Sequence, residues 1–98
     1  MHSIKYSFEA NVWKHDSDGG WHFVSLPEDI SSDIRMHLKH FEEGWGRLKA
    51  KALLKESTWD TAIWFDTKRN TYLLPIKANI RRKFNVKAGD QLNLTITV

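Results

Sequence analysis

The chain has 98 residues, a length that fits one domain over residues 1–98 with a single small hydrophobic core. It contains no cysteine, which excludes a disulfide scaffold, a thiolate metal site and a cysteine nucleophile, and which fits the reducing cytoplasm. No apolar run approaches the roughly 20 residues of a membrane-spanning helix, so no membrane partner is expected.

The first half of the chain predicts a β-hairpin, a helix and a third strand. Residues 5–14 alternate between apolar and polar side chains, which indicates a half-buried strand. The turn-forming residues 16–20 predict a chain reversal, and residues 21–26 are expected to form the return strand of a hairpin. Pro27, followed by two acids, favours the start of a helix of about three turns. Its apolar stripe is expected at Ile30, Ile34, Leu38 and Phe41.

The second half is dominated by strands. Alternating side chains predict strands at 48–54, 59–66, 71–77 and 91–98, with a hairpin turn at 66–70, a short helix at 78–84 and a tight turn at 86–90. Pro75 has no N–H group for a ladder hydrogen bond, so it should lie at the edge or the end of a strand. Six strands, one longer helix and one short helix predict a mainly β protein whose strands close into a small barrel.

Two stretches of the chain resemble each other and suggest an internal repeat. In both, a strand and a proline are followed by a helix with an Ile-Arg pair, a glycine turn and an alternating strand. The first copy begins at residue 23 and ends at residue 54, and the second runs from residue 73 to residue 98. The repeat predicts a barrel with a pseudo-twofold axis.

The second copy resembles the half-barrel of AbrB and MazE transcription factors, through residues 74–83 and 86–92. The whole chain is also similar to a family of small bacterial and archaeal domains of unknown function, which are stand-alone or fused to a YdeI/OmpD-associated (bacteriocin-protection) domain. The matching segments are 8–12, 21–27, 45–48, 59–65, 72–77, 80–81 and 89–90. These resemblances imply a double-split β-barrel closed within one chain, and they imply no activity.

A formal net charge of +3 hides a segregation of charge along the chain. Seven basic residues and no acid lie between Thr67 and Gly89, whereas the rest of the chain holds eight basic and twelve acidic residues. Such a block is typical of surfaces that bind phosphate or nucleic acid, although a solvated face around a turn and a short helix has the same composition. The residues expected to bind are Lys77, Arg81, Arg82, Lys83 and Lys87, with Lys68 and Arg69 on the neighbouring hairpin.

This pattern predicts a non-catalytic binding module for an anionic ligand or an acidic protein partner, without a cofactor, as a monomer or a weak dimer. The alternative is an AbrB-like DNA-binding protein. An AbrB-type protein presents a positive face from both halves of its barrel, but here Glu28, Asp29 and Asp33 begin the first helix. The charge symmetry is therefore broken, and nucleic acid is not the favoured partner.

Metal-binding and catalytic patterns are weak. His37 and His40 have a spacing compatible with a metal ion, with Glu43 nearby, but the sequence places no third ligand, so no metal site is predicted. No two acids or bases are held together by a recognisable motif, so no enzymatic activity is expected.

Five tryptophans are many for a chain of this length. Trp59 and Trp64 are an odd number of positions apart, so they should face opposite sides of one strand, and Trp13 lies on the polar face of its strand. Exposed tryptophans are typical of ligand or partner surfaces. In a small barrel, however, coverage of such faces by the helices is the more ordinary arrangement.

Overall fold

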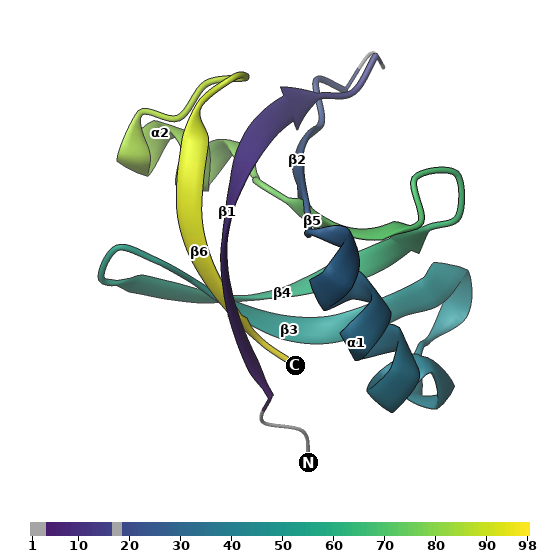
Figure 1. Ribbon diagram of the computed structural model, residues 1–98. Helices are drawn as coiled ribbons and strands as arrows, with labels where there is room; N and C mark the ends of the chain where they lie inside the picture. Colours follow the sequence, from purple (N-terminus) through teal and green to yellow (C-terminus); the bar gives the residue numbers. More distant parts are fainter. Residues whose placement is uncertain (1–3, 17–18) are drawn as a thin grey trace.

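The computed structural model describes residues 4–16 and 19–98 (Figure 1). Within these ranges the chain forms six strands, two α-helices and two short 3-10 helices. In chain order they are β1 (Lys5–Lys14), β2 (His22–Ser25), α1 (Glu28–Leu38), η1 (Lys39–Phe41), η2 (Gly44–Gly46), β3 (Arg47–Leu54), β4 (Ser57–Asp66), β5 (Thr71–Pro75), α2 (Ala78–Phe84) and β6 (Gln91–Thr97).

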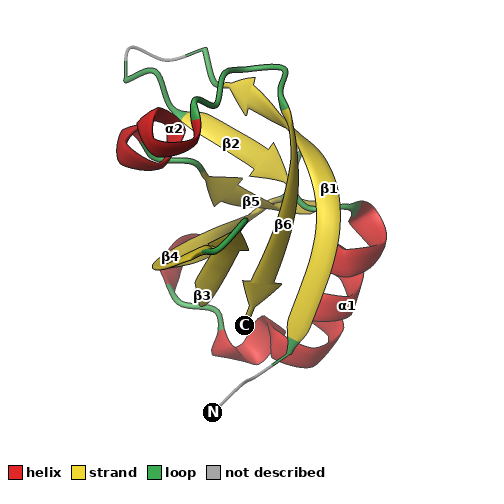
Figure 2. Cartoon of the chain, turned by 90° about the vertical axis from the view of Figure 1, so that its left-hand side faces the viewer, coloured by secondary structure: helices red, strands yellow, loops and turns green. Residues whose placement is uncertain are grey.

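The strands close into a barrel in the order β1-β2-β5-β4-β3-β6, and each neighbouring pair is antiparallel. The two helices lie on different sides of this barrel (Figure 2). The mainly β, closed barrel predicted from the alternating segments is confirmed. No helix in the described part of the chain is long and apolar enough to span a membrane.

The hydrophobic core fills the barrel with the inward faces of the strands. Along β6, Leu92, Leu94 and Ile96 are buried, while the polar residues between them stay at least partly exposed. The period of two residues in a strand produces this alternation, because successive side chains point to opposite faces. The outward residues do not fill the core, and the strand order together with the register decides which of them become neighbours.

The barrel has the symmetry that the repeat predicts. Exchanging β1 with β4, β2 with β5 and β3 with β6 turns the cyclic strand order into itself. The β2·β5 pairing places Val24 opposite Leu74 at its centre. The two prolines are not equivalent, however. Pro75 is the last residue of β5, whereas Pro27 directly precedes α1, a position that Lys77 takes before α2.

α1 is attached to β5 by a buried polar contact. The backbone N–H of Tyr72 donates to the Ser31 hydroxyl oxygen at 3.0 Å, and Ser31 is fully buried. The N–H of Leu26 donates to the carbonyl of Tyr72 at 2.9 Å. These bonds hold the start of α1 against the barrel, since they satisfy backbone groups that have no solvent access.

Two predicted segments end earlier than expected. β5 ends at Pro75, although the N–H of Ile76 still donates to the carbonyl of His22 at 2.9 Å. Pro75 thus lies at a strand end, as predicted. The apolar stripe of α1 ends at Leu38, because the chain then enters η1 and leaves Phe41 49% exposed. The predicted turn at 16–20 includes residues 17–18, which lie outside the described residues.

Candidate functional site

The basic residues predicted to bind lie on α2 and at its two ends. Lys77 precedes the helix, and Lys87 follows it in the turn that leads to β6. The helix stops at Asn85, whose left-handed backbone (φ 54°) lets the N–H of Val86 donate to the carbonyl of Arg81 at 2.8 Å. We call Lys77, Arg81, Arg82, Lys83 and Lys87 the α2 basic surface.

Four of these five cations are exposed, namely Lys77, Arg82, Lys83 and Lys87. Arg81 is half-buried, and its Nη1 donates to the carbonyl of Ile76 at 2.6 Å, which ties the helix to the end of β5. Within residues 4–16 and 19–98, none of the five forms an ion pair with an acidic side chain. Their positive charge is therefore available to an external anion.

A sixth cation joins this surface from the β3–β4 turn. The ammonium of Lys55 lies 5.7 Å from the centre of the Phe84 ring, and that of Lys83 lies 5.6 Å from the same ring. Lys55 has a left-handed backbone (φ 56°) in the turn between the two strands. Sequence reasoning missed it, because Lys55 lies far from α2 in the chain and no local pattern connects them.

Lys68 and Arg69 do not belong to the α2 basic surface, although they share its acid-free stretch of sequence. They lie in the β4–β5 turn, which projects from the barrel far from α2 (Figure 1). Arg69 donates to the carboxylate of Asp66 at 2.7 Å. Burial would raise the pKa of Asp66, but the bond from Arg69 and the backbone N–H groups of Lys68 and Arg69 outweigh it and lower that pKa. Asp66 directly precedes the acid-free stretch that begins at Thr67. The β4–β5 turn is therefore less basic than that stretch alone predicts.

A cleft lined by rings lies between the β1–β2 hairpin and β4. It has a volume of about 410 Å³, and its walls are His15, Trp21, Phe23 and Trp64. The rings of Trp21 and Phe23 are almost parallel, at 9°, with their centres 6.1 Å apart. Trp21 is 53% exposed. We call this feature the aromatic cleft.

A glycine determines where the Trp21 ring lies. A Cβ atom at Gly19 would come within 2.8 Å of the Trp21 Nε1 atom, so the ring occupies space that only glycine leaves free. The carbonyl of Trp21 accepts a hydrogen bond from the N–H of His15 at 2.8 Å, which joins the two ends of the hairpin. The ring of Trp21 is therefore positioned by the space at Gly19, and its backbone by the hydrogen bond from His15.

The other tryptophans separate as the sequence predicts. Trp59 faces inward and packs against the core, whereas Trp64 lines the outer cleft, so the two lie on opposite faces of β4. Trp13 is half-buried on the outer face, where its indole N–H donates to the Ser25 hydroxyl at 3.0 Å. The guanidinium of Arg69 covers its ring at 4.3 Å. The side chains that cover Trp13 therefore come from β2 and the β4–β5 turn rather than from a helix.

Cation-lined hollows adjoin the aromatic cleft on two sides. Trp21 also lines a hollow with Lys77 and Arg81. Trp64 also lines a hollow with Lys77, Arg47 and Lys49, and this hollow contains one acid, Asp60, which pairs with Lys51. Lys77 belongs to both hollows, so the aromatic cleft and the α2 basic surface form one continuous region of the surface.

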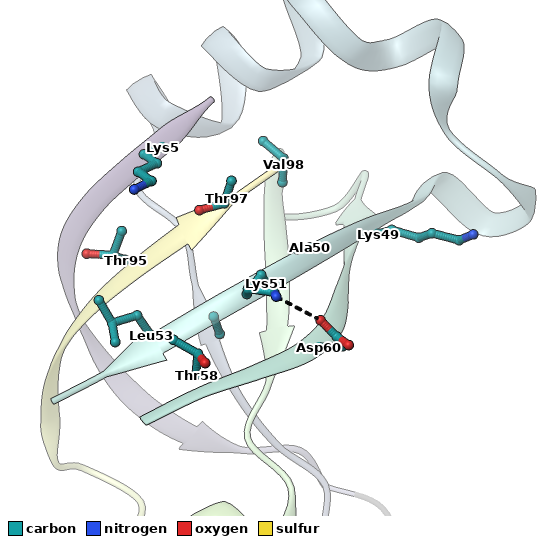
Figure 3. Close-up of a pocket in the computed structure, with 11 residues that line it drawn as sticks. Lys5, Lys49, Ala50, Lys51, Leu53, Thr58, Asp60, Thr95, Thr97 and Val98 are labelled. Atoms are coloured by element: carbon teal, nitrogen blue, oxygen red, sulfur yellow. Dashed lines mark ion pairs between the residues drawn. The ribbon is translucent and has the colours of Figure 1, made fainter. Parts of the chain in front are cut away.

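A larger hollow, of about 830 Å³, lies on the outer face of β3, β4 and β6 (Figure 3). The strand register aligns Lys5, Thr97, Lys51 and Asp60 in a row across four strands. Lys51 pairs with Asp60 at 3.7 Å, and the side chain of Lys49 points away from Lys5. Its cations thus diverge or are paired, which makes this hollow a weaker candidate than the α2 basic surface.

The two histidines of the predicted α1 pair have local contacts. His37 Nδ1 lies 2.8 Å from the carbonyl oxygen of Asp33, and the His40 ring lies 4.2 Å from that of Phe41. In the part of the chain that the structure describes, no three metal-ligating side chains gather into a site.

Among the described residues, the largest pKa shifts belong to the two tyrosines, and both shifts arise from burial and from contacts within the protein. Burial, together with a 2.5 Å hydrogen bond to the Asp33 carboxylate and its charge, raises the pKa of Tyr6 to about 12. Burial and a hydrogen bond to Glu42 also raise the pKa of Tyr72, against the nearby charge of Arg35. Both phenols bridge the barrel to the α1–η1 segment and lie outside the α2 basic surface.

Comparison with known families identifies the barrel as a recognised unit. A family model described as "Domain of unknown function (DUF1905)" matches residues 8–96. The match begins within β1 and ends within β6, so it includes residues from all six strands. No curated protein matches the chain.

Proposed function

The chain belongs to the DUF1905 family, whose description names no activity, and we propose from its surface that it is a non-catalytic binding module for an anionic ligand. The α2 basic surface receives the anion. The observation that carries this proposal is the exposure of four cations that have no acidic partner among the described residues.

The chemistry of these cations suits phosphate or carboxylate groups. Arg82 offers a planar fork of N–H donors, and the surrounding lysines add positive potential. Arg81 contributes less, because one of its nitrogens is already bound to the carbonyl of Ile76. Exposed ion pairs in water are individually weak, so the affinity depends on several cations acting together.

Catalysis has less support than binding. Among the described residues, the groups with clearly shifted pKa values are Tyr6, Asp66 and Tyr72, and each is engaged in a side-chain hydrogen bond within the protein. A general acid or base needs a shifted group that faces a substrate. These three groups lie outside the α2 basic surface and the aromatic cleft.

Double-stranded DNA is a less suitable ligand, because the pseudo-twofold barrel is not symmetric in charge. α1 is the counterpart of α2, but it begins with Glu28 and Asp29 and also carries Asp33. A palindromic duplex would meet cations at one helix and acids at the other, which would repel its phosphates.

The test compares two variants with the same change in net charge. Arg82, Lys83 and Lys87 are replaced by Gln in one variant, and the exposed cations Lys5, Lys39 and Lys68 are replaced by Gln in the control. Binding of heparin and inorganic polyphosphate is measured by calorimetry at about 50 mM and about 200 mM salt.

The first variant should lose at least about tenfold in affinity at the lower salt concentration, while the control keeps most of it. An equal loss in both variants would mean that net charge alone attracts the polyanion, and the proposed surface would then be rejected. The same conclusion follows if neither variant differs from the wild type.

A further inference from the structure

We propose that the aromatic cleft receives an unpaired nucleobase, whose phosphate groups lie against Lys77 and the neighbouring cations. This inference rests on the proposed function, because it identifies the anion as the phosphate of a nucleotide. The base comes from a free nucleotide or from one nucleotide of a single strand, and both offer the same chemistry to the cleft.

The lining of the aromatic cleft selects a flat ring. Its four walls are ring-bearing side chains, and no aliphatic side chain takes part. Nucleobases stack on such rings without regard to sequence, because each base has a π face. Its volume of about 410 Å³ accommodates one base, and Trp21, which is 53% exposed, is accessible for stacking on it.

The cations lie where the phosphates of a stacked base would leave the cleft. Trp21 shares a hollow with Lys77 and Arg81. Trp64 shares one with Lys77, Arg47 and Lys49, in which Asp60 is the single acid among the described residues. Arg47 is partly neutralised by Glu43, whereas Lys77 has no acidic partner among the described residues. Lys77 is therefore the cation best placed to contact a phosphate next to the base.

The aromatic side chains that line the cleft favour an unpaired base over a base pair within a duplex. In double-stranded nucleic acid the base faces are stacked inside the helix and cannot reach a ring-lined cleft. An acidic peptide would use the cations but would gain little from four rings. The hollow of Figure 3 is lined by lysines but by no aromatic side chain of the described residues, so it lacks the stacking surface that the aromatic cleft offers.

The experiment separates the base from the phosphate. The ligands are a thymidine oligonucleotide of about eight nucleotides, an abasic oligonucleotide of the same length and thymidine monophosphate. The variants are Trp21→Ala, Trp21→Phe and, as control, Trp45→Ala, whose side chain is 94% exposed in η2 outside the cleft. Affinities are measured by fluorescence anisotropy of labelled ligands and by competition.

We expect the thymidine oligonucleotide to bind the wild type at least about tenfold more tightly than the abasic one. Trp21→Ala should abolish that difference, Trp21→Phe should restore much of it, and Trp45→Ala should leave it unchanged. Binding of the monophosphate with comparable affinity would identify a free nucleotide as the ligand. A strong preference for the oligonucleotide would identify a single strand.

A second readout locates the base directly. In a spectrum of the indole N–H groups, thymidine monophosphate should shift the signals of Trp21 and Trp64, which line the cleft, and leave those of Trp45 and Trp59 in place. Stacking acts at short range, so a signal that moves identifies a ring in contact with the base.

The two proposals fail in different ways. If abasic and thymidine oligonucleotides bind equally and Trp21→Ala changes neither, the nucleobase site is rejected while the α2 basic surface remains. If the Arg82, Lys83 and Lys87 variant binds like the wild type but Trp21→Ala does not, the α2 basic surface is rejected and the cleft remains. If no ligand binds the wild type at about 50 mM salt, both are rejected.

Discussion

Neighbouring residues of the same type differ in what they can bind. Arg81 and Arg82 are adjacent in the sequence, yet Arg81 donates to the carbonyl of Ile76 and Arg82 is exposed without an ion pair in the described structure. Arg69 is held by Asp66 and by the ring of Trp13. Charge counted along the chain therefore overstates the charge that a ligand can use.

The two tyrosines should titrate abnormally while the protein is folded. Tyr6 and Tyr72 are the only tyrosines of the chain, and the fold raises the pKa of each above the ordinary value of 10. A spectrophotometric titration of the phenolate should therefore show no ionisation step near pH 10 in the native protein. One full tyrosine ionising at pH 10 would contradict the hydrogen bonds to Asp33 and Glu42.

The same shift makes stability depend on pH in the alkaline range. A raised folded-state pKa means that the neutral phenol stabilises the fold, fully below pH 10, where the unfolded chain is also protonated. For Tyr6 this contribution is lost as the pH rises from 10 through the folded-state value of about 12. The free energy of unfolding should fall over that window, and Tyr6→Phe should show a shallower fall.

At the scale of the element, α1 depends on one buried hydroxyl for its attachment. Replacing Ser31 by Ala leaves the backbone N–H of Tyr72 buried without its acceptor. An unsatisfied buried donor costs about 1–3 kcal/mol, so Ser31→Ala should lower the free energy of unfolding by that amount. Urea denaturation followed by circular dichroism measures the change.

The matched control is the next residue of the same helix. Ser32 is exposed, so Ser32→Ala should change stability by less than about 0.5 kcal/mol. Ala has a higher helix propensity than Ser, so propensity favours both variants and cannot explain a loss. A loss at Ser31 no larger than the one at Ser32 would contradict the proposed role of the bond to β5.

The whole molecule depends on contacts between its two halves. β2 pairs with β5 and β3 with β6, so neither the β1-β2-α1-β3 half nor the β4-β5-α2-β6 half closes its own sheet. Each half supplies part of one shared core. We therefore expect the barrel to unfold as a single unit.

Truncation at the centre of the β2·β5 pairing tests this cooperativity. Leu74 is fully buried opposite Val24, so Leu74→Ala should cost about 2–5 kcal/mol. The transitions seen by tryptophan fluorescence and far-ultraviolet circular dichroism should still coincide. Leu73→Ala, at the adjacent half-exposed position, should cost clearly less. Separate transitions would mean that the halves fold independently.

The sequence by itself predicts most elements and the residues that face the core. Alternation locates β1, β4 and β6, and Pro27 and its acids mark the start of α1. In the predicted turn at 86–90, the Asp90 carboxylate accepts the N–H of Lys87 at 2.8 Å. These features depend on residues close together in the chain. Burial of one strand face and local turn chemistry leave few alternatives there.

Only the tertiary structure decided which outward residues meet. His15, Trp21 and Phe23 come from the β1–β2 hairpin, and Trp64 reaches them because β5 lies between β2 and β4. Lys55 approaches α2 by the same kind of long-range arrangement. The alternation along a strand shows which side chains face outward, but it does not show which residues of other strands lie beside them. The order in which the strands close the barrel places them together.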